Sequence, residues 1–201
     1  MERRHRFELI REYMIFAREF LKRPIITGAI APSSPWLAER MTEDMGLHEA
    51  DTIIELGPGT GAFTRVIARK VRQQAVVLAI EANPLLAECL RARFSRVVII
   101  QDSAERLGDH LASVDRASAD CIISGIPWAG FPRELQERLL SAVVRGLGPG
   151  GRFATFAYIN ASWLPRGKRF RAMLMSSFRK VMVTRTEWRN VPPAFIYRCE
   201  K

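Results

Sequence analysis

The chain has 201 residues, of which 48% are hydrophobic and 26% are charged, and this length fits one compact domain with an appended terminal element. The composition excludes intrinsic disorder, and no segment approaches the roughly 18 consecutive apolar residues that a membrane span requires. The 31 basic and 21 acidic residues give a net charge of +10, which favours an anionic partner such as nucleic acid, an anionic membrane face or a negatively charged cofactor. We expect a cytoplasmic protein, because the first 23 residues contain neither the apolar core nor the cleavage site of a signal peptide. The three histidines are isolated from one another and from cysteine, so no metal site is expected.

An amphipathic helix is predicted over residues 1–23, because apolar side chains recur there at helical spacing between basic ones. Such a helix either lies at a membrane interface or packs on the rest of the domain. At a membrane, the contacting residues would be Arg3, Arg4, Phe7, Arg11, Met14 and Phe20. A loop at 28–34 follows, and then a helix that is opened by Ser34 and Pro35 and ends at Gly46. We therefore divide the chain into a docking and lid unit, residues 1–50, and a main domain, residues 51–201.

Between residues 52 and 158, short β-branched runs alternate with amphipathic segments, which predicts βαβ units and a parallel sheet. Strands are expected at 52–56, 75–80, 97–101, 120–124 and 152–158, the last of them after a tight turn at 146–151. The intervening helices should begin at Gly61, at Pro84 behind an Asn83 cap, near Ala104 and at Pro132.

Two further strands are expected at 180–188 and 194–199, after a helix near 168–178. The connection between these strands is too short for a parallel crossover, so the pair should be antiparallel. The predicted fold class is α/β, a Rossmann-like seven-stranded sheet with one antiparallel strand and helices on both faces, preceded by the N-terminal amphipathic helix.

The segment ELGPGTG, from Glu55 to Gly61, turns from the first strand into a helix. Glycines let a ligand approach the backbone, and the helix N-terminus offers unpaired N–H groups to an anionic group. Glu81 ends the second strand, where a carboxylate can accept hydrogen bonds from both ribose hydroxyls of an adenosine-type cofactor. The residues expected to hold such a cofactor are Glu55, Gly57, Pro58, Gly59, Gly61, Glu81, Ala82, Asp102, Ser103, Ala104 and Ser124.

Two cofactors compete for this loop, and a purely structural glycine turn is the third reading. The spacing from Gly57 to Ala62, with Glu81 about 20 residues on, also fits a dinucleotide fingerprint. Glu55 favours S-adenosylmethionine, because an acid at this position can meet the ammonium group of that cofactor and has no role beside a pyrophosphate. Asp102, at the end of the third strand, then fits as an acceptor for the adenine amino group.

The fourth strand ends in SGIPW, residues 124–128, at the edge of the sheet where ligands of open α/β folds bind. This position indicates a methyl-transfer site, and an ordinary strand-to-loop turn is the structural alternative. Adenine amino-methyltransferases carry an Asn/Asp-x-Pro-aromatic pattern here, in which the aromatic ring stacks on an extruded base. Ser124 and Gly125 depart from that pattern, which weakens a reading as base methylation.

Over nearly its full length the sequence resembles the bacterial phospholipid N-methyltransferases, class I enzymes related to ribosomal RNA adenine dimethyltransferases. The resemblance rests on PIITGAIAPSS at 24–34, ELGPGTGAFTR, the Glu81 region, SGIPW, PGGRFATFAY and the ending RNVPPA at 189–194. It implies methyl transfer from S-adenosylmethionine to the amine of phosphatidylethanolamine or its methylated derivatives, towards phosphatidylcholine, with S-adenosylhomocysteine as the product. It also implies an enzyme bound peripherally to the inner face of the cell membrane. Trp128 departs from the family pattern, because the loop after the fourth strand usually has a sequence closer to SGLPL in that family.

The implied reaction is attack of a neutral lipid amine on the sulfonium methyl group, and the candidate catalytic residues are Tyr158 and Ser124. Tyr158 would orient the amine or accept its proton. Aromatic faces attract methylated ammonium groups, so Trp128, Phe156 and Trp163 are candidate substrate-binding residues, although each of them also fits ordinary core or membrane-contact surface. Arg169 is a candidate for the lipid phosphate or part of a solvated helix face.

Two other functions stay open. One is a nucleic-acid methyltransferase of the ribosomal RNA adenine-N6 type, which the positive charge favours and which SGIPW disfavours. The other is a lipid-binding module with a vestigial cofactor pocket, which the intact set of acidic and glycine residues disfavours. The oligomeric state does not follow from the sequence.

Overall fold

The structure, a computed structural model, describes residues 33–201. The helix predicted over residues 1–23, with its six membrane-contacting residues, lies outside the described part. Among the described residues, no helix is both long and apolar enough to cross a membrane.

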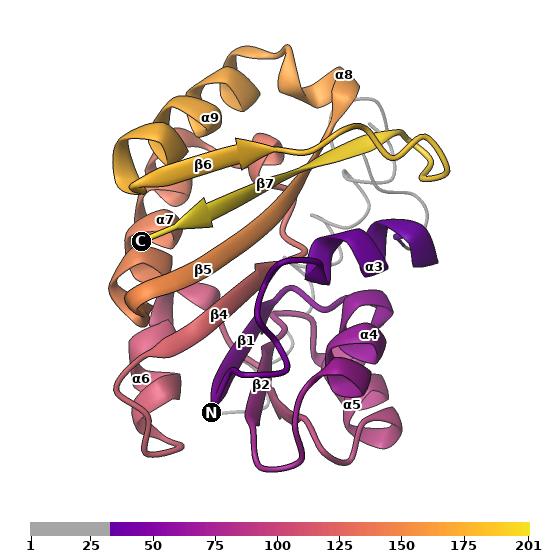
Figure 1. The fold of residues 1–201 in the computed structure, drawn as a ribbon, viewed down its shortest axis with the longest axis vertical. Coiled ribbons are helices and arrows are strands. Elements are labelled where there is room, and N and C mark those ends of the chain that lie inside the picture. Colours follow the sequence, from indigo (N-terminus) through magenta and orange to yellow (C-terminus); the bar gives the residue numbers. More distant parts are fainter. Residues whose placement is uncertain (1–32) are drawn as a thin grey trace, which may run out of the picture.

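The core of the fold is a seven-stranded sheet in the order β3-β2-β1-β4-β5-β7-β6 (Figure 1). Its strands are β1 (Thr52–Leu56), β2 (Val76–Ile80), β3 (Val98–Ile100), β4 (Ala119–Ser124), β5 (Leu147–Tyr158), β6 (Lys180–Val183) and β7 (Ala194–Glu200). Strands β1 to β5 pair in parallel, whereas β7 runs antiparallel to both β5 and β6. The predicted fold class, with its single reversed strand, is therefore confirmed.

Two strand boundaries differ from the prediction by more than one residue. β5 begins at Leu147, and its pairing with β4 shifts from Ala119 opposite Leu147 to Cys121 opposite Arg152, so the expected turn at 146–151 is an irregularity within the strand. β6 ends at Val183 instead of 188, because the Thr184 hydroxyl accepts the Ile196 N–H at 3.0 Å and interrupts the regular ladder. Glu187 then pairs with Ala194 of β7 in an isolated antiparallel bridge.

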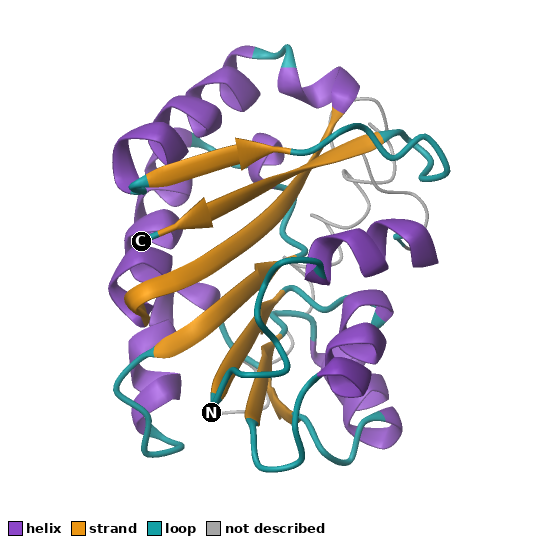
Figure 2. Ribbon diagram, viewed as in Figure 1, coloured by secondary structure: helices purple, strands orange, loops and turns teal. Residues whose placement is uncertain are grey.

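Helices cover both faces of the sheet (Figure 2). One face packs against α3 (Pro35–Thr42), α4 (Ala62–Lys70) and α5 (Pro84–Arg93), and the other against α6 (Leu107–Ala112), α7 (Arg133–Gly146) and α9 (Pro165–Ser177). Three short turns complete the fold: the 3₁₀ turns η1 (Ala104–Arg106) and η2 (Trp128–Gly130), and the helix α8 (Ile159–Ser162).

Two predicted helix starts are confirmed by their caps. The Ser34 hydroxyl accepts the Leu37 N–H at 3.2 Å, and the Asn83 side chain accepts from Leu85 at 2.9 Å. α3 ends at Thr42, before the predicted Gly46, because Glu43 adopts an extended backbone.

Helix α3 belongs to the core. Leu37 and Met41 are completely buried on the sheet face that also holds α4. Ser34 and Asn190 join the beginning of α3 to the segment before β7, since the Ser34 N–H donates to the Asn190 side chain at 2.9 Å. The carboxyl edge of the sheet is thereby bordered by α3 and by the β6–β7 connection.

Candidate active site

The glycine loop follows β1 directly. Gly57, Gly59 and Gly61 have φ angles of 66°, 57° and 83°, which L side chains rarely adopt. A Cβ at Gly61 would lie 2.7 Å from the Phe94 ring, whereas a Cβ at Gly59 would meet no atom within 4 Å. Gly61 therefore serves packing against α5, and Gly59 presents open backbone that a ligand can approach.

Glu55 is an ionisable group in an unusual setting. Its carboxylate is completely buried, and neither oxygen has a hydrogen-bond partner in the described part of the chain. Burial raises its pKa to about 8, and the nearby Glu81 charge adds to the increase. A buried carboxylate without partners is costly unless a cation compensates it, so Glu55 fits the ammonium group of S-adenosylmethionine.

Glu81 lies at the end of β2 and is nearly buried. One carboxylate oxygen accepts the Gly59 N–H and the other accepts the Asn83 N–H, both at 2.9 Å. Burial raises the pKa of Glu81, and these backbone donors act in the opposite direction. Glu81 therefore also holds the glycine loop in place, a function that the sequence did not suggest, and each oxygen retains a lone pair for a ribose hydroxyl.

The third predicted acid, Asp102, follows β3, and its carboxylate has partners within the protein. It accepts from Arg106 at 3.0 Å and lies 3.3 Å from the His110 imidazole, on the face that packs against α6. Its neighbour Ser103 caps η1 by accepting the Glu105 N–H, and Ala104 is buried. Ala82 is exposed beside Glu81.

The end of β4 contacts the glycine loop. The Gly125 N–H donates to Leu56 O at 2.7 Å, and a Cβ at Gly125 would lie 2.5 Å from Gly57 O, so only glycine allows this approach. Ser124 is completely buried, and its hydroxyl accepts the indole N–H of Trp128 at 3.0 Å. The described contacts of Ser124 are thus internal ones that hold the SGIPW loop.

Trp128 packs inside the domain. Its ring stacks on Phe170 of α9, with centroids 4.6 Å apart, and meets the Phe153 ring edge-on. Gln136 of α7 donates to Trp128 O at 2.6 Å and is completely buried. The sequence singled out Trp128 but not these partners, which come from segments that follow it in the chain.

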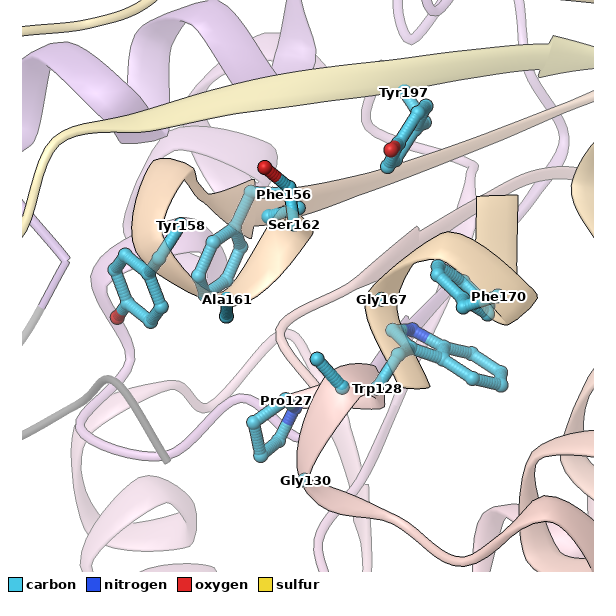
Figure 3. Close-up of a pocket in the computed structure, with 12 residues that line it drawn as sticks. Pro127, Trp128, Gly130, Phe156, Tyr158, Ala161, Ser162, Gly167, Phe170 and Tyr197 are labelled. Carbon is cyan, nitrogen blue, oxygen red and sulfur yellow. The ribbon is translucent and has the colours of Figure 1, made fainter. Parts of the chain in front are cut away.

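A pocket opens at the carboxyl edge of β4 and β5 (Figure 3). It brings together three of the predicted residues, Trp128, Phe156 and Tyr158, and adds Phe170 and Tyr197, which the sequence did not indicate. Burial raises the pKa of Tyr158 to about 12, so its phenol stays neutral near pH 7.

Two predicted substrate residues lie outside this lining. Trp163 follows α8 and is 73% exposed, and Arg169 lies on α9 with partial exposure. The part of the chain that the structure describes holds no group of three or more metal-ligating side chains.

The described residues fit S-adenosylmethionine: an unpartnered buried carboxylate at Glu55, open backbone at Gly59 and a second acid at Glu81 surround the same turn. Residues 53–151 match the family model described as a methyltransferase domain. The solved structure of an O-methyltransferase from Bacillus cereus in complex with SAH aligns with a TM-score of 0.66 and 17% identity, covering 92% of this chain and 90% of that one. Its low identity supports the fold alone.

Two curated relatives bear on the two hypotheses for the acceptor, a lipid and an RNA. The ornithine lipid N-methyltransferase of Singulisphaera acidiphila is 31% identical over 193 residues, covering 94% of this chain and 96% of the relative. The ribosomal RNA small subunit methyltransferase A of Thermotoga petrophila is 29% identical over 102 residues, 51% of this chain and 37% of the relative. The similarity to the lipid enzyme thus spans both proteins. The chain is an S-adenosylmethionine-dependent N-methyltransferase and belongs to the family of the lipid N-methyltransferases, as its sequence motifs predicted.

Proposed function

We propose that this enzyme transfers methyl groups to the primary amine of phosphatidylethanolamine, and to its methylated derivatives, at an anionic membrane surface. The observation that carries the proposal is the near-full-length similarity to a lipid N-methyltransferase. The charge of +10 and the aromatic pocket beside the glycine loop support it.

Ornithine lipid is a second candidate acceptor, because the relative is named for that lipid. Both lipids are acceptors in which nitrogen receives the methyl group. Their head groups differ in shape and charge, so a direct comparison of the two lipids distinguishes them.

S-Adenosylmethionine, when bound, supplies the methyl group. The residues of this chain must present a neutral amine, because an ammonium, with a pKa of about 10 in lysine, has no lone pair. The apolar surroundings of the pocket favour loss of that proton. Tyr158 is neutral at physiological pH, so its role would be to orient the amine through its phenol oxygen instead of acting as a phenolate base.

The exposed aromatic residues support membrane association. Of the four tryptophans, Trp36, Trp163 and Trp188 are exposed by 47%, 73% and 72%. The segments that carry them contact one another at the carboxyl edge. The guanidinium carbon of Arg189, the neighbour of Trp188, lies 5.0 Å from the centre of the Trp36 ring. The Ile159 N–H, at the start of the helix before Trp163, donates to Pro193 O in the segment after Trp188. Tryptophan prefers the membrane–water interface.

Basic residues accompany this surface. The segment 159–171 carries Arg166, Lys168, Arg169 and Arg171 and no acidic residue. Each base near an anionic leaflet contributes about 1 kcal/mol, which salt screens. The double variant Trp163→Ala/Trp188→Ala should weaken sedimentation with anionic vesicles. The control Val98→Ser, at a 45% exposed site that begins β3 at the opposite edge, should bind like the parent, and equal binding of all three proteins would contradict the proposal.

The acceptor itself is tested with labelled cofactor. Purified enzyme receives methyl-labelled S-adenosylmethionine together with vesicles of phosphatidylethanolamine and an anionic lipid, with vesicles of ornithine lipid, or with ribosomal RNA. Label in the chloroform phase of the first sample supports the proposal, and label only in the second reassigns the acceptor to ornithine lipid. Label only in RNA refutes a lipid substrate.

A further inference from the structure

The pocket at the carboxyl edge has an unusual lining. Five aromatic residues line it: Trp128, Phe156, Tyr158, Phe170 and Tyr197. All the other lining residues are proline, alanine, glycine or serine, so the lining contains neither a branched aliphatic side chain nor a charged one. Figure 3 shows the Trp128–Phe170 pair on one side and Phe156 with Tyr158, from the end of β5, on the other. Tyr197 of β7 lies on the side of Phe170, with ring centroids 6.3 Å apart.

The pocket adjoins the glycine loop. Gly125 touches Gly57, and the chain then runs through residues 127–130, which line the pocket. On the next strand, Thr155 pairs with Ser124, so Phe156 and Tyr158 extend from the same edge. A group held in the pocket would therefore lie beside the strand ends that carry the glycine loop.

The polar atoms of the pocket are few and neutral. They include the hydroxyls of Tyr158, Tyr197 and Ser162, and the Ser162 hydroxyl donates to Ile159 O at 2.7 Å. Burial raises the pKa of both phenols, so they contribute uncharged rings and dipoles. The lining therefore offers no charge that could pair with an ionic ligand.

These properties select among the parts of a lipid. An acyl chain is matched by large branched aliphatic side chains and a phosphate by basic ones, and neither type lines this pocket. A primary ammonium needs acceptors that replace its water, and burial without them is costly. A methylated ammonium has fewer N–H donors to satisfy, and aromatic faces attract its positive charge.

We propose that this aromatic pocket binds a methylated ammonium group, that of a partly methylated acceptor or of the fully methylated product. The inference deepens the proposed function and rests on it. A pocket of this kind holds the intermediate near the glycine loop between transfers. It would allow repeated methylation of one head group.

The test compares choline with 3,3-dimethylbutan-1-ol, its uncharged isostere, by saturation-transfer NMR on the full chain with S-adenosylhomocysteine present. Choline should bind about 2- to 30-fold more tightly than the isostere, the range expected for cation–π attraction. Phe170→Leu should reduce that preference, and Tyr197→Phe, which keeps the ring, should retain it. The matched control is Phe178→Leu. Phe178 is buried in the same hydrophobic cluster as Phe170 and stacks on Phe153, but it does not line the pocket.

Equal binding of choline and the isostere would overturn the proposal, since it would show a merely apolar pocket. Absence of choline binding, or loss of the preference in Phe178→Leu as much as in Phe170→Leu, would also overturn it. Lipid labelling without a choline preference refutes the pocket assignment and leaves lipid methylation standing. A choline preference without lipid labelling refutes the lipid acceptor and leaves the pocket assignment standing.

Discussion

Replacement of Glu55 by glutamine should move protein stability and cofactor binding in opposite directions. The carboxylate is completely buried and has no hydrogen-bond partner among the described residues. Its ionised form therefore destabilises the protein without cofactor, and the same charge is available to a cofactor ammonium. Glutamine removes both effects while nearly keeping the shape of the side chain.

The magnitude follows from the pKa of Glu55, which is 4.5 in the reference state and about 8 in the folded protein. The folded state holds this proton more tightly than the unfolded state, so stability falls as pH rises from about 4.5 to about 8. Between pH 5 and pH 8 the loss from this one group is about 3 kcal/mol. For a chain of this size, that corresponds to about 6 to 12 °C in Tm.

The assay is denaturant unfolding of the cofactor-free parent and Glu55→Gln at pH 5 and pH 8, together with calorimetric titration of S-adenosylmethionine. The variant should gain stability relative to the parent on going from pH 5 to pH 8, and it should bind the cofactor at least about 10-fold more weakly, because a buried charge pair is lost. Glu49→Gln, at a side chain that is 78% exposed, is the control and should follow the parent. Parallel pH profiles of parent and Glu55→Gln, or unchanged cofactor affinity, would refute the reasoning.

Three further predictions concern the loops around the site. Gly125→Ala should lower the free energy of unfolding by more than Gly59→Ala does, since a Cβ at Gly125 would meet a backbone oxygen and one at Gly59 would meet open space. The left-handed backbone at Gly59 costs alanine about 1 kcal/mol. Equal losses of the two variants in urea unfolding would contradict this ranking. Ser124→Ala leaves the buried Trp128 N–H without its acceptor and should cost about 1 to 3 kcal/mol in the same assay, which an unchanged unfolding midpoint would disprove. Arg189, the closest partner of Glu187, lowers the pKa of that acid to about 2, so the ion pair stabilises the protein above pH 4.5 and this effect is lost as pH falls towards 2. Glu187→Gln should therefore lower the free energy of unfolding by about 1 to 3 kcal/mol at pH 7 and by less at pH 3. An equal loss at both pH values would argue against the ion pair.

Local signals in the sequence were sufficient for most of the fold. Ser34 and Asn83 cap their helices through atoms two or three residues away, so the pattern that predicts each cap contains both partners. The reversal of β7 followed from the short connection before it. β6 ended earlier than predicted because the Thr184 side chain takes a hydrogen bond from β7, a contact that no local pattern records.

The candidate site shows the same division. The glycine loop, Glu55 and Glu81 lie within one βαβ unit, and the sequence placed them together. Tyr197 and Phe170 enter the pocket from segments that begin far along the chain from Trp128, and only the packing of α9 and β7 brings them there. Trp128 turned out to donate its indole N–H to Ser124, because a buried N–H must find an acceptor.

The central claim is that the nitrogen of the phosphatidylethanolamine head group receives the methyl group. The most direct measurement is mass spectrometry of lipid products after incubation of the enzyme with trideuteromethyl-labelled S-adenosylmethionine and phosphatidylethanolamine vesicles. The account predicts head-group fragments in which one or more trideuteromethyl groups replace hydrogens on nitrogen. Unlabelled head groups, in a sample where the enzyme binds cofactor and vesicles, would contradict it.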